Sequence, residues 1–400
     1  MDIYLSIFIL LLILTFLLFK IQTYSLTVLG FFYVTSWTFL SLIICLIQGY
    51  YVSVMAFFSH ILLAFSFFIP SMVLNKRLKP AKIVAYNTFS YTMMFNAIGF
   101  IGLIFHVSQF GFSLNVLELG KLASDSRYSG EGVSIFQIIG SSFLFVNAFI
   151  FSFLDKLNKK VLISISLTLI LIIMTAVLTS SKASLLMSLT FFLSGYIVRG
   201  ILENKVILFS DKANILKKSM YIISVVIPFS VILQVIRYGG DSSMLDVAID
   251  KIVIYGFGQF SAYSVWFDEN NINLIDGLPG YGIFTGIFSK LFDFERISGF
   301  YDTFTYISSD AYTNVFTLSR FLISDFTFVG ACIILFWLGI LYEVFYMVKM
   351  PIGLKVFFFS SLSIEIIFGF STSILSYNNV LLSLLLIMLF FQLNSKVIRE

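Results

Sequence analysis

The chain of 400 residues alternates long apolar runs with short polar segments. Most runs hold about 20 residues, which is enough to cross the hydrocarbon core of a bilayer as a helix. Helices are expected because lipid offers the backbone no hydrogen-bond partners. We therefore predict an all-α polytopic membrane protein with eleven spans, at 3–19, 26–48, 52–74, 83–107, 134–154, 161–179, 184–202, 220–236, 322–348, 356–375 and 380–394.

The run 3–19 is predicted as the first span and not as a cleavable signal peptide. No basic stretch precedes it and no small-residue cleavage site follows it. Seventeen of the 25 Lys and Arg lie after the odd-numbered spans, and the other eight lie on the opposite side. Because Lys and Arg are enriched in cytoplasmic loops, the N-terminus is predicted outside and the C-terminus inside.

Two segments on the predicted outer side, 108–133 and 237–321, are longer than simple connections. A long loop in a compact chain is usually functional. We therefore predict one integral membrane domain, 1–400, with a large outer loop at 237–321 and a smaller one at 108–133.

Two stretches of the large loop have some helical character. Residues 280–292 predict an amphipathic surface helix. Residues 252–267 are uncharged, but they are few for a span and are interrupted by Gly256 and Gly258. A re-entrant or interfacial helix is expected at 252–267, and a further span is the alternative.

Composition agrees with this class and excludes others. Charged residues make up 12% of the chain and hydrophobic residues 59%, whereas about a quarter of a soluble domain is charged. The formal net charge of +4 is small and gives no sign of nucleic-acid binding. The two Cys lie within apolar runs and the two His are isolated, so we predict no disulfide framework, no metal site and no cofactor.

Four cations are expected at the outer ends of spans, where the charge bias disfavours them. Taken singly, each can be a snorkelling side chain, and two of them can pair with Asp241 and Asp325. Taken together, beside hydroxyls and aromatic rings, they predict one basic pocket for phosphate or pyrophosphate. They are Arg127 in "SRYSGEG", Lys182 in "LTSSKASLL", Arg237 in "VIRYGG" and Arg320 in "LSRFLISDF".

Glu365, in "SLSIEIIFGFSTS", is an acid well inside an expected span. An intramembrane carboxylate is costly and is a functional candidate, although a packing role or a protonated side chain explains it equally well. Tyr238 and Tyr312 are candidates for stacking against sugars. The outer loop carries many acids that could act as a general base, and no spacing singles out one of them.

The layout and several short motifs resemble the bacterial O-antigen polymerase (Wzy) family, the oligosaccharide repeat-unit polymerases. The motifs are "TNVFTLSRFLISDF" (313–326) before an apolar run, together with "SRYSGEG" and "LTSSKASLL". The family pattern reads Thr-Asn, then an Arg, then Asp-Phe-Gly. Here Thr327 replaces the Gly, and Lys182 stands where the family usually has Arg. The matching residues are Thr313, Asn314, Arg320, Asp325 and Phe326.

The resemblance implies a metal-independent glycosyltransferase with a GT-C-like membrane fold, which acts on the periplasmic face of the bacterial inner membrane in lipopolysaccharide biosynthesis. It would transfer a growing glycan from undecaprenyl pyrophosphate to the terminal sugar of an undecaprenyl-pyrophosphate-linked repeat unit. The implied catalytic residues are Arg320, Arg237 and Asp325, and the implied pyrophosphate- or glycan-binding residues are Arg127, Lys182, Tyr238, Tyr312, Asn314 and Glu365.

The implied partners are a Wzz-type chain-length regulator and a flippase, in addition to the lipid bilayer. Two alternatives remain open from the sequence. An O-antigen ligase would use the same donor and a similar fold. A flippase or transporter for lipid-linked oligosaccharide is the other, and the long outer loop and the few deep charges count against it.

Overall fold

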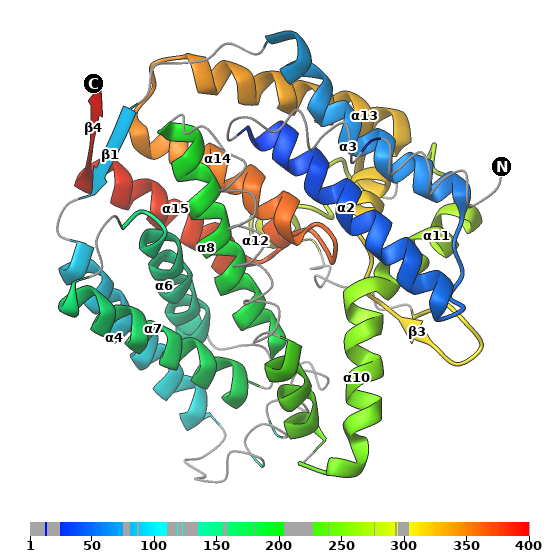
Figure 1. Cartoon of the computed structure of the whole chain (residues 1–400), viewed down its shortest axis with the longest axis horizontal. Helices are drawn as coiled ribbons and strands as arrows, with labels where there is room; N and C mark the ends of the chain where they lie inside the picture. Colours follow the sequence, from blue (N-terminus) through cyan, green and yellow to red (C-terminus); the bar gives the residue numbers. More distant parts are fainter. Residues whose placement is uncertain are drawn as a thin grey trace.

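The computed structural model describes most of the chain, and most of the described part is helical (Figure 1). The described residues are 25–74, 81–85, 88–109, 135–154, 158–179, 181–203, 227–238, 240–275, 277–292 and 304–399, with Ile13, Glu118, Leu122 and Phe294.

Six helices in the described residues are long and apolar enough to cross a membrane, which supports a multi-pass membrane protein. They are α2 (Leu26–Ile47), α3 (Val54–Leu74), α4 (Thr88–Ser108), α7 (Lys159–Leu178), α8 (Lys182–Leu202) and α13 (Leu318–Met347). Shorter helices follow the remaining predicted runs: α6 (Ile135–Phe151), Ile227–Arg237, α14 (Ile352–Phe368) and α15 (Asn378–Asn394). The predicted span 3–19 lies outside the described residues apart from Ile13.

Two predicted span boundaries are wrong. The run predicted at 83–107 begins as the strand β1 (Ala81–Ala85), which pairs antiparallel with β4 (Ser395–Arg399) near the C-terminal end. The run predicted at 356–375 leaves the helix after Phe368, because the following residues turn back to start α15. The expected all-α fold therefore also contains short strands: β1–β4, and a hairpin of β2 (Thr305–Tyr306) and β3 (Tyr312–Thr313).

The helices form two groups that α14 and α15 connect (Figure 1). Helices α4, α6, α7 and α8 pack together in one group, and α2, α3 and α13 pack together in the other. Helix α15 packs on α6, and α14 packs on α8, α2 and α15.

Small residues let α4 and α6 approach closely. A Cβ on Gly102 would lie 2.6 Å from the carbonyl oxygen of Phe136 and 2.8 Å from Cα of Gly140. Glycine is needed there because any side chain would collide with the partner backbone. Close approach of this kind is a usual way to pack membrane helices, since lipid provides little hydrophobic force between them.

Buried amides and hydroxyls join α4, α6 and α7. Asn147 Nδ2 donates to the carbonyl of Thr92 and to Asn96 Oδ1, both at 3.0 Å. Thr168 Oγ1 donates to the same Asn96 Oδ1 at 2.7 Å, and Ser164 Oγ donates to Thr92 Oγ1 at 2.8 Å. Since lipid cannot replace these partners, the network favours one arrangement of the three helices.

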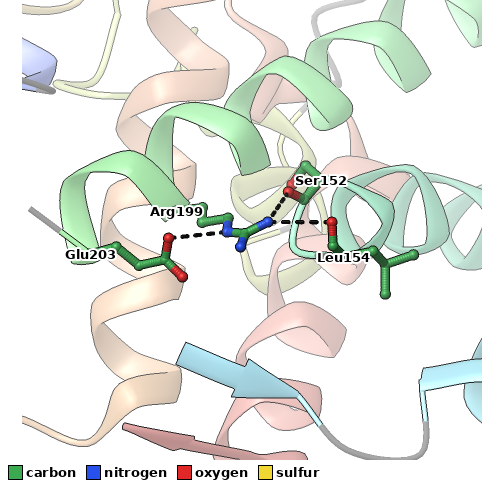
Figure 2. A network of polar contacts seen from close by, with 4 residues as sticks. All are labelled: Ser152, Leu154, Arg199 and Glu203. Carbon is green, nitrogen blue, oxygen red and sulfur yellow. Dashed lines mark hydrogen bonds and ion pairs between the residues drawn. The ribbon is translucent and has the colours of Figure 1, made fainter. Parts of the chain in front are cut away.

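The last turn of α8 is tied to the end of α6 by Arg199 (Figure 2). Its Nε lies 3.2 Å from Glu203 Oε2, and its Nη1 donates to the carbonyls of Ser152 and Leu154, each at 3.4 Å. Arg199 is 9% exposed and Glu203 7%. The guanidinium thus binds backbone carbonyls just past the end of α6, where intrahelical donors are lacking.

Replacing Arg199 with Met is expected to lower the thermal unfolding temperature of the purified protein in nanodiscs. Removing one partner of a buried ion pair costs about 3–5 kcal/mol, because the other charge stays buried. Arg199→Met with Glu203→Gln should recover part of the loss. The exposed Lys349→Met is the matched control, and equal unfolding temperatures for Arg199→Met and Lys349→Met would contradict this role.

Candidate functional site

The candidate site lies at one end of the bundle, which we call the mouth. The mouth is formed by the end of α2, the starts of α3 and α13 and the end of α14. One hydrogen bond joins the start of α13 to the end of α14, and a second joins the connection between α2 and α3 to the hairpin of β2 and β3. Leu318 N donates to the carbonyl of Gly369 at 2.7 Å, and Tyr51 N donates to the carbonyl of Ile307 at 2.8 Å.

Helix α13 begins four residues before the predicted span at 322–348, and Thr327 divides it in two. Thr327 has φ 62° and ψ 167°, a conformation that is strained for a β-branched residue. Phe328 N donates to the carbonyl of Ile272 at 3.0 Å, and Gly330 N donates to Thr327 Oγ1 at 3.2 Å. These bonds hold the kink, so 318–326 forms a separate short segment that carries Arg320 and Asp325 at the mouth.

Arg320 lies among aromatic rings. Its guanidinium carbon is 3.8 Å from the ring centroid of Phe316 and 5.3 Å from that of Trp266. The side chain is only 8% exposed. Stacking on ring faces stabilises a guanidinium and fixes the plane of its donors.

Asp325 holds the backbone of the large loop. It is 2% exposed, and its two carboxylate oxygens accept from Gly282 N at 2.9 Å and from Ile283 N at 3.0 Å. Such charge-assisted bonds are among the stronger ones in proteins. The geometry therefore makes Asp325 a positioning residue for the segment 280–284.

The amphipathic helix predicted at 280–292 is shorter than expected. Residues 280–284 form a turn, and α12 covers only Thr285–Leu291. The bonds that Gly282 N and Ile283 N donate to Asp325 explain why the helix starts late, because these two N–H groups are not available for helical hydrogen bonds.

Lys182 and Arg237 are the two predicted cations that the structure brings together. Their positive charges interact electrostatically. Lys182 Nζ also lies 5.3 Å from the ring centroid of Tyr255. Tyr255 belongs to the π-helical turn Ile254–Gly258 between α10 (Leu245–Val253) and α11 (Gln259–Glu269). An anion near Lys182 and Arg237 would relieve their mutual repulsion.

The remaining predicted residues have separate surroundings. Tyr238 is half-buried at the end of the helix Ile227–Arg237, where its N–H donates to the Val235 carbonyl at 3.0 Å. Tyr312 is exposed on the hairpin, with Lys251 Nζ 4.6 Å from its ring centroid. Asn314 is half-buried just after the hairpin. The prediction for Arg127 lies outside the described residues.

The stretch predicted as re-entrant or interfacial, 252–267, packs against the mouth. Cys45 Sγ lies 3.5 Å from the carbonyl of Phe257. At the other end of the stretch, Asp268 accepts from Tyr51 Oη at 2.6 Å and from Ser53 Oγ at 2.8 Å. The bond to Asp268 raises the pKa of Tyr51. The stretch therefore contacts the end of α2 and the start of α3.

Asp241 holds the turn that follows it. Its Oδ1 accepts from Ser243 N at 2.9 Å. Hydrogen bonds from Ser243 lower the pKa of this exposed carboxyl. In the described part of the chain, no three His, Cys, Asp or Glu side chains are grouped closely enough to hold a metal ion.

A cavity of about 460 Å³ lies between α2, α3, α13 and α14 and reaches the start of α11. Most of its walls are apolar, with Phe31, Leu63, Phe67, Leu335 and Leu338 among the lining residues. A pocket of this size matches a small-molecule site.

Polar side chains make up a small part of the cavity wall. We call six of them the polar end of the cavity: Ser41, His60, Gln259, Thr317, Ser319 and Glu365. Tyr33, Thr38 and Ser361 are further polar lining residues, and most of the remaining wall is apolar.

Glu365 has a structural partner at the polar end. Its Oε2 accepts from Ile374 N at 3.1 Å and from Leu375 N at 3.2 Å. These bonds fix the turn between α14 and α15. Glu365 also lines the cavity, so a second role toward a ligand is compatible with the geometry.

Sequence reasoning missed several residues of the polar end. His60 Nδ1 and Ser319 Oγ are 2.6 Å apart, although they are 259 residues apart in sequence. Gln259 was part of a stretch considered only for its topology. Thr317 and Ser319 had a signal, through their place in "TNVFTLSRFLISDF". Comparison of the chain with protein-family models, with curated proteins and with solved structures gave no match.

Proposed function

We propose that this protein is a membrane glycosyltransferase of the O-antigen polymerase type. The observation that carries the proposal is the largely apolar cavity lined by Thr317 and Ser319, the neighbours in sequence of Leu318 and Arg320. A polyprenyl chain needs an apolar channel within the membrane, and the cavity provides one. The pyrophosphate on that chain needs cations, which Arg320 on α13 and Lys182 on α8 would supply.

In the proposed reaction, the bond between the anomeric carbon of the donor glycan and a pyrophosphate oxygen breaks. The acceptor hydroxyl oxygen forms the new bond to that carbon and gives its proton to a base. Undecaprenyl pyrophosphate leaves as an anion. Fixed cations stabilise such a developing charge, and we assign this role to Arg320 and to the pair Lys182 and Arg237.

The kink at Thr327 supports the resemblance to the O-antigen polymerase family. The family pattern has Gly after Asp-Phe, and Thr327 adopts a positive φ that glycine adopts without strain. The departure in sequence therefore keeps the backbone conformation that a glycine would favour.

The proposal includes the finer architecture that the sequence predicted. The chain would cross the bacterial inner membrane eleven times in a GT-C-like fold, with the mouth on the periplasmic side. The N-terminus would be periplasmic and the C-terminus cytoplasmic. A Wzz-type regulator and a flippase would work with it, and its substrates would be undecaprenyl-pyrophosphate-linked oligosaccharides.

A lipopolysaccharide gel from a strain lacking the gene tests the proposal. Core with a single repeat unit, without the ladder of longer chains, is expected, because flipping and ligation continue without polymerisation. Core alone would contradict a polymerase. In that case, polymer accumulating on undecaprenyl pyrophosphate would indicate a ligase, and no such polymer would indicate a flippase. An unchanged ladder would exclude all three.

A further inference from the structure

Four side chains at the polar end of the cavity carry polar atoms that need a partner. Within the described part of the chain, Ser41 Oγ, both amide atoms of Gln259, Thr317 Oγ1 and Glu365 Oε1 are buried and form no hydrogen bond with protein. Gln259 and Ser41 are each 1% exposed and Thr317 is 4% exposed. Burying such groups without a partner is costly, so their gathering in one cavity indicates a ligand.

Ser41 and Gln259 line the same cavity. Trp37 stacks on Phe257 at 5.2 Å, and Cys45 lies against the Phe257 carbonyl. Ser41 is four residues from both Trp37 and Cys45, so it shares their face of α2. Gln259 is the first residue of α11, which packs on α2.

Thr317 and Glu365 line the same cavity as well. The bond from Leu318 N to the Gly369 carbonyl joins the start of α13 to the end of α14. Thr317 precedes Leu318, and Glu365 lies one helical turn before Gly369. Trp37 connects the two pairs, because it contacts Phe370 at 4.7 Å as well as Phe257.

The chemistry of this set favours an uncharged hydroxylated group. An amide offers donors and an acceptor, each hydroxyl offers both, and Glu365 Oε1 accepts. Sugar hydroxyls match this mixture. Lys and Arg are not among the described residues that line the cavity, so a phosphate inside it would lack a counter-charge.

We propose that the polar end is a sugar-binding subsite, in which Gln259, Thr317 and Ser41 bind hydroxyls of an uncharged sugar of the glycan. The inference rests on the proposed function and deepens it. It separates a neutral sugar subsite in the cavity from the anion-stabilising cations, Arg320 and the pair Lys182 and Arg237.

The test measures binding of two probes to the full-length protein in nanodiscs. Radiolabelled octyl β-glucoside, below its critical micelle concentration, is compared with octyl phosphate, which has the same chain and an anionic head. We expect saturable glucoside binding at least roughly tenfold tighter than phosphate binding. Gln259→Leu should weaken glucoside binding by roughly tenfold or more, because it removes the whole amide.

Gln48→Leu is the matched control, since Gln48 is exposed at the end of α2. If Gln259→Leu does not fold, Thr317→Val removes one hydroxyl at nearly constant shape and should also weaken glucoside binding. The subsite is wrong if phosphate binds as tightly as glucoside. It is also wrong if the folded Gln259 or Thr317 variant binds glucoside like the wild-type protein.

The two proposals fail differently. Arg320→Ala should lose polymer formation and keep glucoside binding. If loss of the gene leaves the lipopolysaccharide ladder unchanged, while the protein still binds glucoside through Gln259, the polymerase is refuted and the subsite stands. Normal polymerase activity without glucoside binding would refute the subsite and keep the polymerase.

Discussion

Arg320→Ala is expected to abolish polymer while the protein still inserts into the membrane. Removing one preorganised donor to a developing oxyanion costs about 10²–10³ in rate, which is enough to erase a ladder on a gel. Arg320→Lys should recover only part of the rate, because an ammonium neither stacks on Phe316 and Trp266 like a guanidinium nor binds phosphate bidentately.

Arg237→Ala should also abolish polymer, because it leaves Lys182 as the single cation of that pair. Lys251→Ala is the matched control for both. Lys251 also stacks on an aromatic ring, that of the exposed Tyr312, and it has no proposed role in the reaction. Complementation of a deletion strain, with membrane levels measured by immunoblot, provides the readout. A normal ladder from both Arg320→Ala and Arg237→Ala would refute the cation hypothesis.

Asp325→Asn is expected to lower the unfolding temperature and to expose the segment 277–292 to protease. An Asn amide can accept only one of the two backbone bonds, and its NH₂ group would face the other N–H. Losing a charge-assisted bond at a buried site costs about 1.5–3 kcal/mol, and more where a donor is left unpaired. Asp310→Asn, at an exposed carboxylate of the hairpin turn, is the control.

The same variant separates the two roles considered for Asp325. If Asp325 is a positioning residue, turnover and stability should fall together, since Ile283 and Phe284 belong to the segment it holds and line the cavity. A catalytic carboxylate predicts lost turnover with an unchanged unfolding temperature and unchanged protease sensitivity. That second result would refute the positioning role of Asp325.

Much of the fold could be predicted from the sequence, because a membrane span is a local property. The apolar runs that became α2, α3, α7 and α8 were placed within a few residues of their observed ends. The failures occurred where a distant segment decides the outcome. Strand β1 exists because β4, more than 300 residues later, supplies its hydrogen bonds, and the end of α14 follows from the bonds between Glu365 and the turn after it.

The candidate site was predicted in part. The sequence could single out Arg320, Lys182 and Arg237 as candidates, because a cation at the end of an apolar run is visible in the local pattern. It could not separate the binding role of a side chain from a positioning role. Asp325 looks like an acid beside an Arg, and only the fold shows that it binds Gly282 and Ile283.

The sequence by itself determined the class of this protein, its apolar helices and the cations at their ends, since each depends on a stretch shorter than one span. Only the tertiary structure decided which of these groups meet. The cavity draws its polar end from four helices and the start of α11, and Gln259 and Ser41 carry no local sign of function. The physical reason is that a buried polar group is defined by its partners, and here those partners come from segments far apart in the chain.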